Sequence, residues 1–329
     1  MSSQLSKLFL IMLTLKLVFP AGDAFAEDYR LLRIGTGGLH GVYYPIGNAL
    51  AEGITSANIA TGLIAVAQTS GGSVENVQAL TSGDIEAGLV QADVALWALR
   101  GEGPFAGEGG RPVRALASLY PEHLQILVRR DAQIHRVTDF RGKTISLDVA
   151  GSGTLAVMRI ILAAHGLSEN DFNPVYLKPE FTTERLADGK LHGISLVAGI
   201  PVKAIAEIAG QEFSFLPIDP DIASIITHEH PYLVPSVIPA ETYSGRPEIP
   251  TMEVNALLLV HEGLDEDLVY AMTAAIWDEQ TQALLRSAHS QGRSVTLESA
   301  VHGLSVPLHS GAIRFYQEQK LLPKEEPTS

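Results

Sequence analysis

Three short turns of this chain combine residue types that suit an anion. They are Gly35–Tyr44, Thr69–Ser73 and Gly151–Thr154, and each follows an expected strand and opens an expected helix. Backbone N–H groups at a helix N-terminus lack intrahelical partners, and the helix dipole adds partial positive charge there. Glycine lets the backbone approach a ligand, and Ser or Thr hydroxyls can bond one. A single such turn is better explained by helix capping, whereas three together favour a seat for a carboxylate.

Side chains near these turns extend the possible chemistry. Tyr43 and Tyr44 lie beside the first turn and offer flat faces and hydroxyls. Gln91 and Asp93 follow a fourth expected strand, Ala87–Val90. Gln91 could bond a polar ligand group. Asp93 could bind an ammonium or cap the next helix.

Signatures of catalysis are missing from the sequence. There is no G-x-S-x-G, no G-x-x-x-x-G-K-[ST] and no H-E-x-x-H. The spacing of Gly35, Gly37 and Gly41 has one residue too many for the dinucleotide pattern, and the next strand ends in Gln68-Thr69 without an acid for a ribose. We therefore expect no catalytic residue and no cofactor.

Metal binding is not predicted either. The chain has no cysteine, which excludes disulfides, thiol catalysis and Cys-ligated metals. His228-Glu229-His230 places two imidazoles close together, but no third ligand is placed by spacing, and a zinc site needs three protein ligands. This segment is interpreted as a solvated loop.

The first 26 residues have the layout of a secretory signal peptide. Lys7 gives a basic start, Leu8–Val18 is an apolar run, and Ala24-Phe25-Ala26 is a cleavage site before Glu27. The run is too short to remain as a membrane-spanning helix. We expect export across the inner membrane and a mature chain that begins at Glu27.

Charge narrows the range of partners. The whole chain carries a net charge of −14. Loss of Lys7, Lys16 and Asp23 with the leader makes this about −15. Such a charge disfavours nucleic acid and anionic membrane surfaces. An anionic ligand stays possible, because local N–H groups outweigh a distant, screened field.

Strands and helices alternate along the chain in two series, which predicts two α/β lobes, each with a mainly parallel sheet flanked by helices. A helix-Gly-strand pattern in Leu80–Val90 is echoed in Leu186–Leu196. Ligands of such sheets bind beyond the carboxyl ends of the strands, so a crevice is expected between the lobes. The first lobe is expected to comprise 27–120 and 255–329, and the second 121–254.

Four expectations concern the segments between and after the two series. Two extended segments should flank Pro121, and Val254–Val260 should be a returning strand. Pro217–Pro250 is interpreted as a long ordered loop, because it is rich in proline and lacks periodicity. One long helix should run from Asp265 to about Ser287.

Several segments together resemble the TAXI family of TRAP-transporter solute receptors, over nearly all of the mature chain. The segments are Ile34–Gly37, Gly41–Pro45, Thr69–Asn76, Gln91–Asp93, Asp139–Lys143, Gly151–Thr154 and Pro307–Tyr316. The resemblance implies a two-lobed periplasmic-binding-protein fold of type II and a location in the periplasm. It also implies capture of a small organic anion or amino acid, such as glutamate or a dicarboxylate. The TRAP membrane subunits, which an ion gradient drives, would receive the ligand.

The resemblance also implies the ligand contacts. They are Thr36, Gly37, Gly38, Tyr43, Ser70, Ser73, Gln91, Ser152, Gly153 and Thr154. The chain departs from the family at Leu155, where an acid is common, and in Leu196–Pro201, which lacks aromatic residues. A monomer is expected. Two alternatives are a receptor that presents its ligand to a sensor kinase and a periplasmic enzyme.

Overall fold

The structure is a computed structural model that describes residues 30–323 apart from 61, 209 and 211. The expected signal peptide, 1–26, lies outside the described residues. Within the described part of the chain, no helix is long and apolar enough to cross a membrane.

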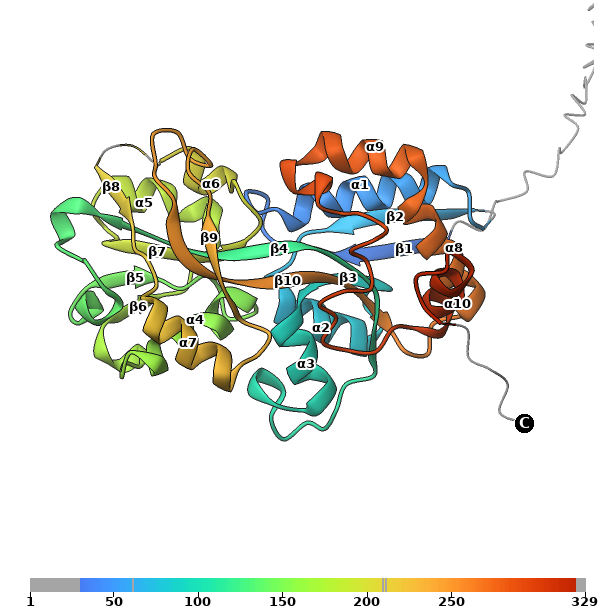
Figure 1. Cartoon of the computed structure of the whole chain (residues 1–329), viewed down its shortest axis with the longest axis horizontal. Coiled ribbons are helices and arrows are strands. Elements are labelled where there is room, and N and C mark those ends of the chain that lie inside the picture. The colour runs from blue at the N-terminus through green and yellow to red at the C-terminus, as the bar shows by residue number, and fades with distance from the viewer. Residues whose placement is uncertain (1–29, 61, 209, 211, 324–329) are drawn as a thin grey trace, which may run out of the picture.

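The first lobe is built on three parallel strands, β1 (Arg30–Gly35), β2 (Leu63–Gln68) and β3 (Ala87–Gln91) (Figure 1). β1 lies between the other two. Because the three strands are parallel, their carboxyl ends all point the same way, toward the middle of the molecule (Figure 1). Buried side chains from β1 and β3 include Leu32 and Leu89. The parallel sheet predicted from the alternating strands and helices is confirmed here.

The second lobe repeats the arrangement with shorter strands. β5 (Thr144–Ser146) lies between β6 (Asn173–Val175) and β7 (Gly193–Ala198), and both pairings are parallel. β8 (Phe213–Phe215) pairs antiparallel with β4, which is described next.

Two long antiparallel strands, β4 (Val113–Arg129) and β10 (Ile249–His261), connect the lobes in one ten-stranded sheet (Figure 1). Eight of its strands follow the order β2-β1-β3-β10-β4-β7-β5-β6, and the other two, β8 and β9 (Val234–Ile238), pair with β4 and β10. β4 has 17 residues, which spans roughly 55 Å at 3.3 Å per residue. The two extended segments predicted around Pro121 are confirmed, but they form one strand, because Pro121 is accommodated inside β4 opposite Asn255. The lobe boundaries stay a prediction, since both strands run through them.

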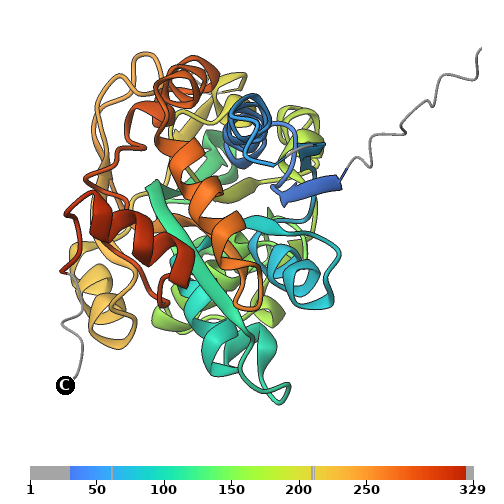
Figure 2. The same cartoon turned by 90° about the vertical axis from the view of Figure 1, so that its right-hand side faces the viewer.

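Helices cover both faces of the sheet. In the first lobe they are α1 (Tyr43–Ser56), α2 (Ser73–Ser82), α3 (Ala92–Arg100), α8 (Glu266–Trp277), α9 (Glu279–Ala288) and α10 (Ser310–Glu318). In the second lobe they are α4 (Gly153–Ala164), α5 (Thr183–Ala187), α6 (Lys203–Ala206) and α7 (Pro220–Glu229). Figure 2 shows α8 and α10 side by side at the end of the first lobe.

Two predictions for the C-terminal half need correction. The segment Pro217–Pro250 is not a loop throughout, because it contains α7 and strand β9 (Val234–Ile238), which pairs with β10. The long helix expected after Asp265 is two helices. Asp278 leaves the helical conformation and its side chain accepts a hydrogen bond from the N–H of Gln280, at 2.9 Å, which starts α9 anew.

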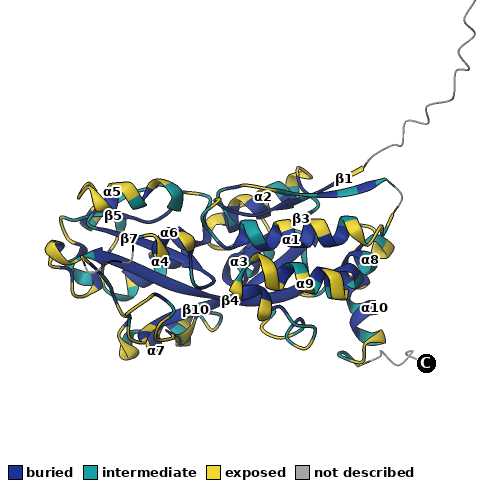
Figure 3. Cartoon of the chain, turned by 90° about the horizontal axis from the view of Figure 1, so that it is seen from above, coloured by how far each residue is buried: buried dark blue, intermediate teal, exposed yellow. Residues whose placement is uncertain are grey.

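The core consists of two apolar clusters on opposite faces of the sheet. Leu257 and Leu258 are neighbours on β10 and both are completely buried, yet they belong to different clusters, as strand alternation requires. Figure 3 shows that most of the length of β4 and β10 is buried. The sheet is therefore a shared support from which loops of both lobes reach the crevice.

Candidate ligand-binding site

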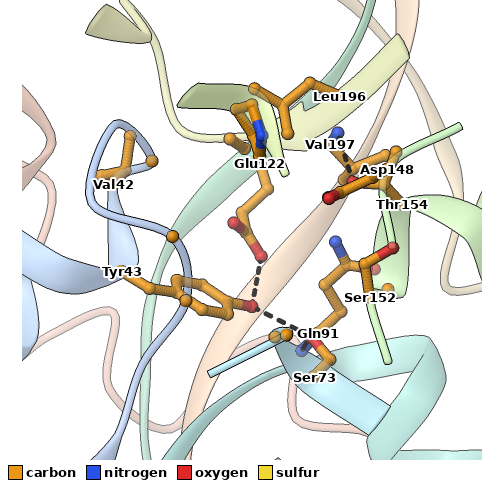
Figure 4. A pocket seen from close by; sticks show the side chains of 18 of the residues that line it. Val42, Tyr43, Ser73, Gln91, Glu122, Asp148, Ser152, Thr154, Leu196 and Val197 are labelled. Atoms are coloured by element: carbon orange, nitrogen blue, oxygen red, sulfur yellow. Dashed lines mark hydrogen bonds between the residues drawn. The ribbon is translucent and has the colours of Figure 1, made fainter. Parts of the chain in front are cut away.

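Nine of the ten predicted contacts line one cavity of about 60 Å³ between the lobes, the exception being Thr36. Since about 10–15 Å³ is the least volume that admits one water, the cavity has room for ordered water or for a small solute group. Its walls come from the starts of α1, α2 and α4 and the ends of β3, β5 and β7 (Figure 4). The lining residues are Gly37, Gly38, Gly41, Val42, Tyr43, Ser70–Ser73, Gln91, Glu122, Asp148, Ser152, Gly153, Thr154, Lys178, Pro179 and Leu196–Ala198.

Thr36 lies beneath the cavity wall. It is completely buried, and its hydroxyl donates a 2.6 Å hydrogen bond to the carbonyl of Gln68. Its own carbonyl accepts hydrogen bonds from the hydroxyl of Ser70 and the amide of Asn76. Thr36 thus ties the first two turns together.

The second turn uses its hydrogen-bonding groups internally. The N–H of Gly72 donates to the hydroxyl of Ser70, and the N–H of Gly71 donates to the carboxylate of Glu75, both at 2.9 Å. Gly72 has a φ of +109°, which a residue with a side chain rarely adopts. This turn therefore forms part of the cavity wall.

The second and third turns meet across the crevice. The N–H groups of Val74 and Glu75, in the first turn of α2, both donate to the carbonyl of Gly151, at 3.0 and 3.2 Å. The carbonyl oxygen of Gly151, from the second lobe, therefore occupies the N-terminus of α2, where the sequence predicted an anion. Since these bonds join the lobes, the structure represents the closed form.

A buried pair, Tyr43 and Glu122, lies deep in the cavity (Figure 4). The Tyr43 hydroxyl donates a 2.7 Å hydrogen bond to Oε2 of Glu122, which is 1% exposed. Burial raises the pKa of the Glu122 carboxyl well above its usual range, although the bond from Tyr43 opposes this. The Ser73 hydroxyl lies 3.4 Å from that of Tyr43 and accepts a bond from the N–H of Gln91.

A second carboxyl, that of Asp148, lies at the end of β5. Its Oδ1 accepts a 2.8 Å hydrogen bond from the N–H of Val149, and burial raises its pKa to about 7. The backbone φ of Asp148 is +67°, so the strand turns sharply here toward α4. Lys178 is the basic side chain among the lining residues. The sequence analysis missed Glu122, Asp148 and Lys178; a lone acid between the apolar segments on either side of Pro121 was the available signal for Glu122.

The third turn is both wall and helix start. The Ser152 hydroxyl caps α4 by accepting a 3.1 Å bond from the N–H of Leu155. The Thr154 hydroxyl accepts a 3.1 Å bond from the N–H of Val197 on β7. The first N–H groups of α4, at Gly153 and Thr154, have no intrahelical acceptor by helix geometry, so they are the donors that can face an anion.

Gln91 and Asp93 have different surroundings. The Gln91 side chain reaches into the cavity, is 3% exposed, and its Oε1 has no hydrogen-bond partner among the described residues. Asp93 does not line the cavity and is not the N-cap of α3, a position that Gln91 holds. Neither carboxyl oxygen of Asp93 has a partner in the described part of the chain, and burial raises its pKa to about 7.

The histidine cluster is not a loop. His228 and Glu229 close helix α7, and the His230 ring is hydrogen-bonded to the hydroxyl of Tyr232. Among the residues that the structure describes, no group of three or more His, Asp or Glu side chains could hold a metal ion.

The fold and the interlobe cavity define a class, the two-lobed α/β binding proteins. A family model described as NMT1-like matches residues 34–319, and the chain belongs to this family. The match covers both lobes and the connecting strands.

Solved structures share the fold at low identity. The binding protein component of an ABC phosphonate transporter from Pseudomonas aeruginosa matches with a TM-score of 0.51 and 8% identity, over 79% of this chain and 79% of that one. A protein from Bordetella bronchiseptica RB50 matches with a TM-score of 0.51 and 14% identity, over 88% and 98%. The periplasmic aliphatic sulphonate binding protein of Escherichia coli matches with a TM-score of 0.46 and 16% identity, over 90% and 94%. The chain has the fold of the two-lobed periplasmic binding proteins.

Proposed function

We propose that this protein is a periplasmic receptor that captures a small carboxylate solute between its lobes and delivers it to a membrane transporter. One observation carries the proposal: turns from both lobes, predicted as ligand contacts, wall a single small cavity. No covalent step is proposed.

Capture follows from the closed geometry. A ligand carboxylate would lie against the first N–H groups of α4 and near Lys178, while Tyr43 would pack on the body of the ligand. The lobes would part by bending of β4 and β10, which are the strands they share. The bonds from Val74 and Glu75 to Gly151 would then form only on closure.

Two ligand classes suit this site at first sight, an amino acid such as glutamate and a dicarboxylate. Both carry the carboxylate that the start of α4 can bind. The sulphonate and phosphonate named for the structural neighbours are also oxyanions.

The transporter we propose is of the TRAP type, on the strength of the resemblance to the TAXI receptors. The neighbour from Pseudomonas aeruginosa is named as part of an ABC transporter, but likeness at 8% identity concerns the fold alone. Solute uptake into proteoliposomes that hold the TRAP membrane subunits separates these cases. Uptake that needs this receptor and an ion gradient supports the proposal, and uptake that needs ATP and an ABC permease contradicts it.

A thermal-shift screen tests solute capture. The chain from Glu27 onward is heated with each member of a panel of amino acids, organic acids, phosphonates and sulphonates. A solute present at 100 times its dissociation constant adds about 2.7 kcal/mol to the stability of the folded form, so the melting temperature should rise by several degrees. If no solute in the panel raises it, the receptor function is contradicted.

A further inference from the structure

A second set of hydrogen bonds joins the lobes, apart from the set at the start of α2. The short 3₁₀ helix η6 (Ser290–Arg293) follows α9 of the first lobe and meets the segment after β7 of the second lobe. The hydroxyl of Ser290 and the side-chain amide of Gln291 both donate to the carbonyl of Ile200, at 3.1 and 3.0 Å. Gln291 is 8% exposed, so its bond is largely shielded from water. These side chains are placed to hold the lobes together.

The segment that η6 meets is fixed within the second lobe. The N–H of Val202 donates a 2.9 Å hydrogen bond to the hydroxyl of Tyr243, and that hydroxyl donates to Oε1 of Gln125 on β4. Gly199 permits close approach, because a Cβ at this position would lie 2.7 Å from Cγ of Gln291. The carbonyls of this segment are therefore in position before η6 reaches them, and little ordering is needed on closure.

His289 bonds to the same segment in one protonation state. Its Nε2 lies 2.9 Å from the carbonyl oxygen of Pro201, which can only accept, so Nε2 carries the hydrogen. Its Nδ1 accepts a 3.1 Å hydrogen bond from the N–H of Gln291, which caps η6, so Nδ1 carries none. The two bonds together require the neutral imidazole.

A proton on Nδ1 would break this arrangement. The new N–H would point at the N–H of Gln291, and the residue whose side chain bonds to Ile200 would lose its anchor. The bond from Nε2 to the Pro201 carbonyl would strengthen, but burial outweighs it. Burial lowers the pKa of His289 from its usual 6.5, and the bond to Pro201 offsets this only in part. When the lobes part, water reaches the imidazole and the penalty of burial disappears.

We propose that His289 and η6 form a proton-sensitive clasp, which holds the lobes closed while His289 is neutral and releases them when His289 is protonated. Because the closed form binds the proton more weakly than the open form, the closed-to-open ratio is highest above about pH 6.5. Below that pH the ratio falls, by at most about tenfold per pH unit. The consequence, release of a captured solute in acid, rests on the proposed function, whereas the clasp itself is tested without a solute.

Other groups that carry charge must be separated from His289. The elements that meet at this residue carry exposed charged side chains, namely Arg286 on α9, Arg293 in η6, and Lys203 and Glu207 at α6. Two further groups of the crevice and the shared strands have shifted pKa values. Burial raises the pKa of Asp148 to about 7 and lowers that of His123, which lies 3.3 Å from Glu253. A variant without the His289 imidazole therefore decides which group controls closure.

Double electron–electron resonance measures closure without a solute. The chain has no cysteine, so spin labels at Gln78→Cys on α2 and Glu184→Cys on α5 report one distance across the crevice. Both positions are exposed, and Figure 3 shows the two helices along the same edge of the molecule. From about pH 8 to about pH 5, we expect the closed-to-open ratio of the labelled chain, which begins at Glu27, to fall at least about threefold.

Variants of the labelled chain assign the change to the clasp. His289→Gln keeps a donor for the Pro201 carbonyl but does not titrate, so it should lose most of the response to pH. Gln291→Met removes the amide at similar volume and should lower the ratio at least about threefold at both pH values. Ser290→Ala provides the same test if Gln291→Met does not fold. His302→Gln changes an exposed histidine outside the clasp and should follow the labelled parent.

Three results would overturn the clasp. They are a ratio that does not change with pH, a response of His289→Gln equal to that of the labelled parent, and a ratio that neither Gln291→Met nor Ser290→Ala changes. A distance distribution with no closed form at about pH 8 also overturns it, because the clasp would then hold nothing. Failure of every solute in the thermal-shift panel overturns the receptor function and leaves the clasp standing.

Discussion

The N–H of Val74, in the first turn of α2, donates a 3.0 Å hydrogen bond to the carbonyl of Gly151, in the loop that precedes α4. This bond joins the two lobes at the edge of the cavity. If the lobes part, this helix N-terminus loses its acceptor to water. We therefore expect the second predicted anion seat to act in closure.

Amide hydrogen exchange should detect that closure. Addition of a solute found in the thermal-shift screen should slow exchange at Val74 and Glu75 by at least about tenfold, because both amides gain an acceptor only in the closed form. The amide of Gly72 is the internal control, since it bonds to Ser70 within its own lobe. Equal protection of all three amides with and without solute would contradict the role in closure.

Replacement of Gly153 by alanine should hinder closure. A Cβ at this position would collide with the amide group of Gln91 on the facing lobe. We expect Gly153→Ala to weaken solute binding by about 1–3 kcal/mol, as overpacking does elsewhere, with the melting temperature of the free protein almost unchanged. A double-mutant cycle by isothermal titration checks the cause: Gly153→Ala should cost less in a Gln91→Ala background. If the effects of the two substitutions on binding are additive, the loss of affinity does not come from a collision with Gln91.

Stability should fall as pH rises because of Asp93. Burial raises its pKa from 3.8 to about 7, so the folded chain binds more protons than the unfolded chain between these values. The free energy of unfolding therefore decreases as pH rises from about 4 to 7, by about 4 kcal/mol for this group alone. Asp93→Asn should be more stable than the parent at pH 8 by about 1–3 kcal/mol, since the buried amide has a desolvation cost of its own.

Urea unfolding at several pH values measures this difference. The Glu102→Gln variant should follow the parent curve, because Glu102 is exposed. Parallel curves for Asp93→Asn and the parent would show that Asp93 does not titrate in this range.

The Tyr43–Glu122 pair should contribute to folding as well as to the cavity. Tyr43→Phe removes the donor and leaves a buried carboxyl without it, at an expected cost of about 1–3 kcal/mol in the free energy of unfolding. In the Glu122→Leu background the same change should cost much less, because no buried carboxyl then remains. Equal costs in the two backgrounds, measured by urea unfolding, would show that the hydrogen bond contributes nothing.

Ser152 and Thr154 serve the fold directly. Ser152→Ala removes the cap of α4, and we expect a loss of about 1 kcal/mol in the free energy of unfolding. Thr154→Ser keeps the hydroxyl that accepts from Val197 and should be nearly neutral, whereas Thr154→Ala leaves a buried N–H unpaired and should cost about 1–3 kcal/mol. Wild-type stability of Thr154→Ala by urea unfolding would contradict this role.

The sequence predicts the strand–turn–helix units well, because glycine, serine and helix periodicity are local signals. Gly83 shows this: it ends α2 with a φ of +78°, as expected for a C-terminal glycine. The nine cavity residues were predicted from the resemblance to the TAXI family, whose motifs include these turns and Gln91. Whether they bind a solute stays a prediction.

What the sequence did not indicate depends on contacts between distant segments. The local preference of proline predicts that a strand ends at Pro121. Pairing with β10 instead continues β4 past this residue. Glu122 has no sequence neighbour that explains its burial, since its partner Tyr43 lies 79 positions away. The hydrogen bonds from the first turn of α2 to the carbonyl of Gly151 depend on how the two lobes meet. The residue pattern of a single turn does not contain this information.

A crystal structure of the protein with the solute selected by thermal shift tests the central claim most directly. The account predicts density for the solute between Tyr43, Glu122 and the start of α4, with its carboxylate at the N–H groups of Gly153 and Thr154. Solute density outside this cavity, or an empty cavity in crystals whose solute saturates the protein in solution, would contradict it.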